Sequence, residues 1–343
     1  PRLDYSTGAE AFLLEPQSTN LITDSNDFSD SSWTKTGVTS TLSATELSPN
    51  GFDYSTSLVG DVATASTKRI RNSHSFTLLT AHSFSVYVKA DSRNYIQLIN
   101  SGDAQGYANF DIANGIVGTL GSKSTSKITS LSNGWFRCEL TTDATAVNGQ
   151  FMIYLADNNI SNFGSSSSGT EGVYVWGAQL EELSYATSLI PTSGTTVTRN
   201  QELCVDATPV INSEEGVLYA EIAALANDGT KRYISLNNGT NNYDVRIYLD
   251  LNGYISVLSK VAGTSQVFLQ SNSYTQTDFN KVAFKYKEND FALWINGVKV
   301  ATDTSGITSP ANKLNQLDFN GNSLDFFGNT KGLKVYPKAL SDV

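Results

Sequence analysis

Hydrophobic and polar residues alternate along most of the chain, with the period of two that is typical of β-strands. The clearest runs are residues 84–89, 95–98, 107–112, 135–140, 151–155, 173–180, 217–222, 232–236, 245–249, 254–258, 281–286 and 291–295. Clusters of Gly, Asn, Asp and Ser separate the runs, and Asn114-Gly115 and Asn296-Gly297 are typical of tight hairpin turns. Helical periodicity is almost absent. The pattern therefore predicts an all-β fold of antiparallel β-sandwiches.

The chain has 343 residues, which is enough for two domains of ordinary size. Between Ser184 and Asn200 the sequence becomes polar and contains Pro and Gly, as linkers do. We therefore expect an N-terminal connecting segment (1–19), a first sandwich (20–183), a linker (184–203) and a second sandwich (204–343).

Composition narrows the classes of partner. Asp, Glu, Lys and Arg make up only 16% of the chain and the net charge is −10, with 23 basic residues spread thinly. Nucleic-acid binding needs clustered basic residues, so we expect neither nucleic acid nor an anionic membrane surface as a partner. No apolar run approaches the ~18–20 residues of a membrane span, so no membrane insertion is expected. An acidic surface rich in hydroxyl groups fits an extracellular location.

Two cysteines, Cys138 and Cys204, are too few for a disulfide scaffold. We expect two separate thiols that are buried or partly buried, since cysteine is among the most buried residue types. A bridge between them is the weaker alternative.

Strand alternation yields a set of candidate binding residues. In five strands of the first half, aromatic rings recur on the face opposite the apolar side chains, beside amides and one guanidinium. The candidates are Tyr87, Tyr95, Gln97, Tyr107, Asn109, Trp135, Arg137 and Tyr154. Sugars stack their C–H faces on aromatic rings and hydrogen-bond amides, so this set suits a glycan. The same residues also suit a protein interface or an ordinary surface, and strands from two different sheets would divide the set.

Catalytic patterns are not found in the sequence. Glycosidases need two carboxyl groups at a fixed separation, but Glu181-Glu182 and Glu214-Glu215 are adjacent pairs whose members point to opposite faces of a strand. His74 and His82 are the only histidines and neither lies near a nucleophile motif. We therefore expect no enzymatic activity and no certain cofactor.

The sequence contains one possible metal site. The carboxylates of Asp24, Asp27 and Asp30 could supply oxygen ligands to a structural calcium ion, although their spacing is not that of a loop site. A solvated loop is the stronger alternative.

Five pieces of the first half carry a resemblance to a known family. They are LLEPQSTNL at 13–21, WTKTGV at 33–38, NGWFRC at 133–138, WGAQLE at 176–181 and YATSLIPTSG at 185–194. Their order and spacing resemble the carbohydrate-binding-module-like jelly roll of phage and prophage tail-fibre and head-fibre proteins. In the second half, NKVAFKY at 280–286, WING at 294–297 and GLKVYPKALS at 332–341 resemble a laminin-G/concanavalin-A-like lectin domain.

The resemblance implies a structural protein of the virion, such as a tail fibre, head fibre or decoration protein, that attaches to host-surface glycans without enzymatic activity. The implied partners are a cell-surface polysaccharide, other virion proteins and copies of the chain itself, with a trimer as one assembly. The implied location is the virion surface, and such jelly rolls often bind structural calcium. Two alternatives stay open: the carbohydrate-binding region of a secreted bacterial polysaccharide-degrading enzyme, and a depolymerase tailspike.

Overall fold

The structure is a computed structural model that describes residues 2–5, 10–62, 67–103, 105–160, 169–205, 207–319 and 325–341. Within these ranges the secondary structure is β-strand apart from one 3-10 turn, Ser132–Gly134, so the expected all-β class is confirmed. No helix in the described part of the chain is long and apolar enough to cross a membrane. The chain forms two compact units: Gln17–Asn200, here called the first sandwich, and Pro1–Pro16 with Gln201–Val343, the second sandwich.

The first sandwich contains two six-stranded antiparallel sheets. Sheet I has the order β11-β10-β9-β14-β7-β4, with β4 Thr34–Thr36, β7 Arg69–Ser75, β9 Tyr95–Asn100, β10 Tyr107–Asp111, β11 Ile116–Leu120 and β14 Asn148–Ala156. Sheet II has the order β12-β13-β8-β15-β6-β5, with β5 Val38–Leu47, β6 Tyr54–Gly60, β8 Ala81–Ala90, β12 Ser124–Ser130, β13 Trp135–Asp143 and β15 Gly172–Glu181. A short pair, β3 (Ser18–Asn20) and β16 (Val197–Arg199), completes it.

The core of the first sandwich is made by the inward phase of these strands. Phe84, Val86 and Val88 of β8 are fully buried, as the alternation predicts, and they belong to one cluster with Phe110 and Phe151 of sheet I. Because side chains alternate across a strand, the neighbouring residues of each strand lie on the outer face of its sheet.

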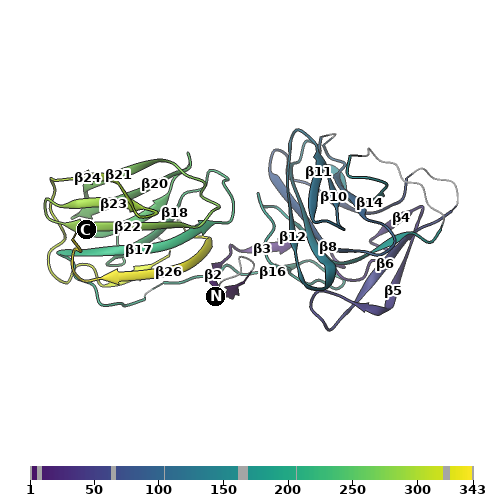
Figure 1. The fold of residues 1–343 in the computed structure, drawn as a ribbon, viewed down its shortest axis with the longest axis horizontal. Helices are drawn as coiled ribbons and strands as arrows, with labels where there is room; N and C mark the ends of the chain where they lie inside the picture. Colours follow the sequence, from purple (N-terminus) through teal and green to yellow (C-terminus); the bar gives the residue numbers. More distant parts are fainter. Residues whose placement is uncertain are drawn as a thin grey trace. The chain divides into compact units, whose positions relative to one another are not determined.

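The second sandwich also has two sheets. The seven-stranded sheet has the order β1-β2-β26-β17-β22-β23-β24, with β1 Arg2–Asp4, β2 Ala11–Leu14, β17 Glu215–Ala224, β22 Asn280–Lys287, β23 Phe291–Ile295, β24 Val298–Asp303 and β26 Gly328–Tyr336. The five-stranded sheet has the order β21-β20-β19-β18-β25, with β18 Arg232–Asn237, β19 Asp244–Leu249, β20 Tyr254–Val261, β21 Thr264–Ser273 and β25 Gln316–Asp318. Figure 1 shows β26 alongside β17, although β17 comes early and β26 late in the sequence of the second sandwich.

The units differ from the expected domain boundaries at the N-terminus. Residues 1–16 are not a connecting segment, because β2 pairs with β26 and Leu14 is buried in the core of the second sandwich. Arg2 forms ion pairs with Glu15 and Glu202, which hold this segment to the chain that follows the first sandwich. In sequence, the first sandwich is therefore inserted between β2 and β17.

The expected linker, 184–203, also differs. Thr187, Ile190 and Thr192 are buried, and residues up to Asn200 belong to the first sandwich. The composition of this segment is that of a linker, but its polar groups are used in hydrogen bonds to sheet II, which are described below.

Both cysteines are free thiols, as expected. Cys138 lies in the core of the first sandwich, and burial raises its pKa well above the ordinary value. Cys204 packs at the edge of the core of the second sandwich, where burial also raises its pKa.

Candidate functional site

The eight candidate residues do not form one patch, because their strands belong to two sheets. Five of them lie on the outer face of sheet I: Tyr95, Gln97, Tyr107, Asn109 and Tyr154. The other three lie on the outer face of sheet II: Tyr87, Trp135 and Arg137. The candidates are divided because their strands pair into different sheets, and alternation along a single strand does not show which strands pair.

The part of the outer face of sheet II around the end of β15 is covered by the chain's own segments. Glu181, fully buried at the end of β15, accepts hydrogen bonds from Ser18 Oγ (2.7 Å), Gln179 Nε2 (2.7 Å) and the backbone N–H of Thr187 (2.9 Å). Asn20 Nδ2 donates to the carbonyls of Ala178 (3.1 Å) and Ile190 (2.9 Å). Two of the sequence pieces that carry the family resemblance, at 176–181 and 185–194, therefore stabilise this face.

The three candidates on sheet II are engaged within the fold. Arg137 Nη2 donates to Ser85 Oγ (2.8 Å) and to the carbonyl of Thr187 (2.5 Å). The Tyr87 ring lies 5.4 Å from that of Trp176, edge to face. Trp135 is only 1% exposed and donates its indole N–H to the carbonyl of Leu47 at 3.1 Å. Trp135 lies on the outer face, as alternation predicts, but it is covered there, and the contacts of all three side chains stabilise the fold.

The outer face of sheet I has a different character. Strand register places Tyr107, Ile99, Met152 and Arg71 in one row across four strands. A second row contains Asn109, Gln97, Tyr154 and Arg69.

An apolar cluster separate from the main core lies on this face. It consists of Ile99, Met152 and Tyr154, which are 4–6% exposed, with Tyr107 packed against them. Gln97, Asn109 and Tyr154 are buried on this face and thus less exposed than alternation alone predicts.

A hollow of about 250 Å³ lies over this cluster. Its lining residues are Ile99, Ser101, Asp103, Gly106, Tyr107, Met152 and Tyr154. The side chains combine an apolar floor, two phenol rings, a hydroxyl group and a carboxylate. We call this the tyrosine hollow.

Asp103 is the charged group of the tyrosine hollow. Its Oδ1 accepts the backbone N–H of Gln105 at 2.8 Å, and Lys123 Nζ lies 3.9 Å from Oδ2. Oδ2 has no hydrogen-bond partner among the described residues, although it is buried. A buried acceptor without a donor costs free energy, so this oxygen is suited to accept a hydrogen bond from a bound hydroxyl group.

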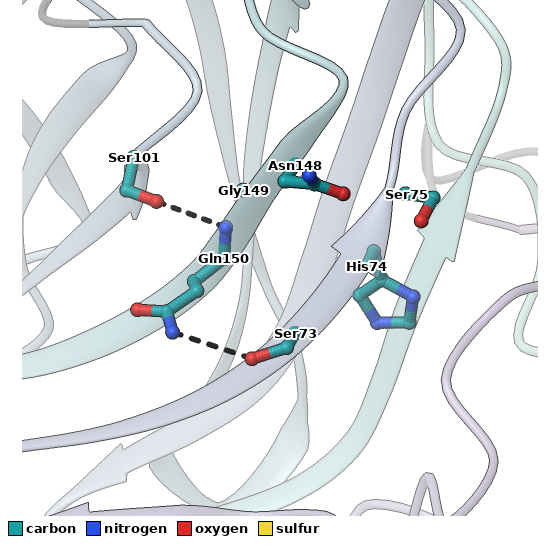
Figure 2. A pocket seen from close by; sticks show the side chains of 7 residues that line it. All are labelled: Ser73, His74, Ser75, Ser101, Asn148, Gly149 and Gln150. Atoms are coloured by element: carbon teal, nitrogen blue, oxygen red, sulfur yellow. Dashed lines mark hydrogen bonds between the residues drawn. The ribbon is translucent and has the colours of Figure 1, made fainter.

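A second hollow, of about 420 Å³, shares Ser101 with the first (Figure 2). We call it the serine hollow, and it is lined by Ser73, His74, Ser75, Ser101, Asn148, Gly149 and Gln150. Figure 2 shows Gln150 between two of its serines: Ser101 Oγ accepts the backbone N–H of Gln150 at 2.9 Å, and Gln150 Nε2 donates to Ser73 Oγ at 3.3 Å. This lining is polar and, apart from His74, does not titrate.

The imidazole of His74 is held neutral near pH 7. Burial, with a smaller contribution from the nearby His82, lowers its pKa to about 4. A neutral imidazole at the wall of the serine hollow can donate or accept one hydrogen bond, but it carries no charge there.

The calcium candidates are hydrogen-bonded to neighbouring backbone. Asp24 Oδ1 accepts the N–H of Gly194 (2.9 Å), Asp27 Oδ1 accepts that of Ser29 (2.9 Å), and Asp30 Oδ1 accepts that of Ser32 (2.7 Å). The hydrogen bond from Ser32 lowers the pKa of Asp30. Among the described residues, no group of three or more His, Cys, Asp or Glu is placed to hold a metal ion. Asp27 and Asp30 therefore serve as turn residues, and Asp24 joins its loop to the segment at Gly194.

Several residues of the two hollows were missed by sequence reasoning. Ile99 follows Leu98, and Met152 lies between Phe151 and Ile153, so each breaks the alternation with an apolar side chain on the outer face. Such a break is the signal that could have found them. Strand β7 was missed because Ile70 is its only large apolar residue.

Comparisons with known proteins were made for the whole chain. No protein-family model and no curated protein sequence matches it. Among solved structures, it is similar to the CBM40 of the Ruminococcus gnavus IT-sialidase, at 18% identity and a TM-score of 0.32, over 38% of this chain and 79% of that one. It is also similar to domains LG4-5 of the mouse laminin alpha1 chain, at 7% identity and a TM-score of 0.30, over 78% and 88%.

Sheep galectin-11, solved in complex with glycerol, is similar at 11% identity and a TM-score of 0.29, over 40% of this chain and 98% of that one. At such identities and TM-scores the similarity does not extend to a ligand or an activity.

Proposed function

We propose that this protein binds saccharides without catalysis, through the outer face of sheet I. The observation that carries the proposal is the tyrosine hollow, where Ile99 and Met152 form an apolar floor, Tyr107 and Tyr154 supply phenol rings, and Asp103 supplies an acceptor. A pyranose ring has apolar C–H faces and hydroxyl groups on its edges. Ligand sites of this kind are mostly apolar with a few placed polar groups, which is the composition of this hollow.

The serine hollow extends the site. Because the two hollows share Ser101, a ligand can run from the phenol rings toward Gln150 and Ser73. The amide and hydroxyl groups there both donate and accept hydrogen bonds, as the hydroxyl groups of a sugar do. We therefore propose an oligosaccharide rather than a single sugar as the ligand.

The proposal does not include hydrolysis. Cleavage of a glycosidic bond usually needs two carboxyl groups about 5–9.5 Å apart. Asp103 is the one carboxylate among the described lining residues of the two hollows. Glu181, which the sequence pairs with Glu182, is buried in the network on sheet II.

The biological setting is proposed from the sequence resemblance. We propose a fibre, head-fibre or decoration component at the surface of a phage particle, in contact with other virion proteins and with a host cell-surface polysaccharide. Several copies, for example in a trimer, would combine weak sites through effective concentration. The alternatives are the binding region of a secreted bacterial polysaccharide-degrading enzyme and a depolymerase tailspike. Imaging of the particle with an antibody against this chain tests the setting, and release of reducing ends from capsule tests the last alternative.

A glycan array tests the function itself. The chain, displayed on a multivalent support, is expected to retain at least one class of bacterial or host oligosaccharide. Tyr107→Ala is expected to weaken that binding about ten-fold by removing a ring that contacts the sugar. Tyr54→Ala is the matched control, because Tyr54 is a half-exposed tyrosine on β6 of sheet II. Retention of no saccharide, or equal losses in the two variants, would contradict the proposal.

A further inference from the structure

Two arginines on the outer face of sheet I, Arg69 and Arg71, form no ion pair with a carboxylate in the described part of the chain. Arg69 Nη1 donates to the phenol oxygen of Tyr154, and its guanidinium carbon lies 5.4 Å from the centre of that ring. Arg71 Nη1 donates to Gln150 Oε1 at 3.3 Å. Both partners are neutral, and the Nε of each arginine is buried without a hydrogen-bond partner in the described part of the chain.

The lack of a carboxylate beside either guanidinium, among the residues described, is unusual in a chain with 33 acidic residues and a net charge of −10. Five other arginines have a carboxylate oxygen within 4.0 Å: Arg2, Arg93, Arg137, Arg232 and Arg246. Arg69 and Arg71 alternate on one strand with Ile70, so the two guanidinium groups project from the same face. Two like charges on one face raise the free energy of the empty site and favour a bound anion.

The nearby carboxylates do not neutralise this pair. Asp103 lies beside Lys123, and Asp157 forms an ion pair with Arg93 at 2.5 Å. Asp111 accepts hydrogen bonds from the backbone of Ala113 and Asn114 in its own turn. The positive charge of Arg69 and Arg71 therefore remains available at the site.

The position of the pair relates it to both hollows. Arg71 is the direct cross-strand neighbour of Met152, which forms the floor of the tyrosine hollow, and it bonds Gln150 of the serine hollow. Arg69 is the direct cross-strand neighbour of Tyr154, a wall of the tyrosine hollow. An anionic group that reaches these guanidinium groups can belong to a sugar whose ring lies on Ile99 and Met152.

We infer that the saccharide of this site is acidic and carries a carboxylate that Arg69 and Arg71 bind. This inference rests on the proposed function and names the class of sugar that the same site takes. A planar carboxylate matches the fork of N–H groups on a guanidinium, which makes arginine the residue suited to this recognition. The sugar ring then contacts the apolar floor, and its hydroxyl groups lie within the reach of Asp103 and Ser101.

An array of matched pairs tests the inference. Each pair holds a uronic-acid or sialylated oligosaccharide beside the same oligosaccharide with its carboxyl group reduced to an alcohol, and sulfated oligosaccharides form a third arm. The wild-type chain is expected to bind the carboxylated member at least ten-fold more tightly than the reduced one. Arg71→Gln is expected to lose at least ten-fold toward carboxylated members and to change little toward reduced ones. Lys127→Gln, which removes an equal charge from exposed β12 of sheet II, is the control and is expected to bind as the wild type does.

The outcomes separate the inference from the proposed function. Equal binding of both members of a pair, with no effect of Arg71→Gln, overturns the acidic-sugar inference and leaves the saccharide site in place. Binding of sulfated members alone overturns the choice of a carboxylate. No retention of any saccharide overturns both. If Arg71→Gln does not fold, the salt dependence of binding by the wild-type chain tests the inference instead. Its affinity for carboxylated members should fall as the salt concentration rises. An affinity that does not change with salt would count against the inference.

Discussion

The two sheets of the first sandwich carry similar residues on their outer faces but have different neighbours. Sheet II presents Tyr87, Trp176 and Arg137, and sheet I presents Tyr107, Tyr154 and Arg71. On sheet II the chain returns over part of the face and hydrogen-bonds Arg137 and Glu181, whereas sheet I has two hollows and an arginine pair for which the described residues supply no carboxylate partner. Residue type therefore does not separate a stabilising face from a binding face. What separates the two faces is whether another segment of the chain packs on the sheet.

The largest expected effect concerns the covered face. Glu181→Ala removes the acceptor of several buried hydrogen bonds that join β15 to the segments around Ser18 and Thr187. We expect a loss of about 3 kcal/mol in the free energy of unfolding, because buried donors lose a charged partner. Chemical denaturation measures the loss. Glu182→Ala is the control, since Glu182 is exposed and only accepts a hydrogen bond from Thr77 Oγ1 at 3.2 Å; equal losses in the two variants would contradict the network on sheet II.

A pair of tyrosines compares the two faces directly. Tyr87→Ala should cost about 2 kcal/mol of stability, because its ring packs against Trp176 and beneath Arg137, whose guanidinium carbon lies 5.5 Å from the ring centre. At a temperature where the variant is folded, saccharide binding should be unchanged. Tyr107→Ala should show the reverse, with reduced affinity and a smaller loss of stability. Thermal unfolding measures the stability of both variants, and titration calorimetry measures their affinity for the saccharide. A loss of binding in Tyr87→Ala would contradict the comparison of the two faces.

His74 makes sheet I sensitive to acid. Its folded-state pKa is about 4 because of burial, while the unfolded chain has an imidazole pKa near ~6.5. Stability is therefore complete above pH ~6.5 and falls as the pH decreases toward 4, since only the unfolded chain takes up the proton in that range.

We expect this residue to contribute a loss of about 2 kcal/mol between pH 7 and pH 4.5. Urea unfolding of the wild type and of His74→Asn at both pH values isolates the contribution, because other groups titrate in both proteins. A wild type and variant with the same pH dependence would show that His74 does not titrate as described.

The smallest expected effect is that of calcium. Asp24, Asp27 and Asp30 are engaged with backbone N–H groups, so removal of divalent cations with a chelator should shift the midpoint of thermal unfolding by less than about 1 °C. A larger shift that added calcium reverses would place a metal ion in the first sandwich, as the sequence resemblance implied.

Alternation along each strand predicted much of the fold. Phe84, Val86 and Val88 point into the core as predicted, because a pleated strand that buries one face must have an apolar residue at every second position. Strand pairing could not be predicted in the same way, since it depends on contacts between distant segments. For this reason Tyr87 and Tyr107, which share the same phase, were placed in one patch although they belong to different sheets.

Segments with unusual composition were the other source of error. Residues 184–200 contain Ser, Thr, Pro and Gly as a linker would, but their polar groups pair with Asn20, Gln179 and Glu181 in the interior. Strand β7 carries few apolar residues, and it supplies Arg69 and Arg71, the charged part of the site. A buried hydrogen-bond network and a binding face both replace apolar residues with polar ones, so hydrophobic periodicity does not detect either.

Met152 offers the most direct measurement, because it is the one methionine of the sequence and forms the floor of the tyrosine hollow. A methyl-labelled methionine gives a single NMR signal that reports on the outer face of sheet I. On titration with a saccharide that the array identifies, we predict a saturable shift of this signal and magnetisation transfer from its methyl group to the sugar protons. A Met152 signal that does not change while the saccharide reaches saturation would contradict a binding site on this face.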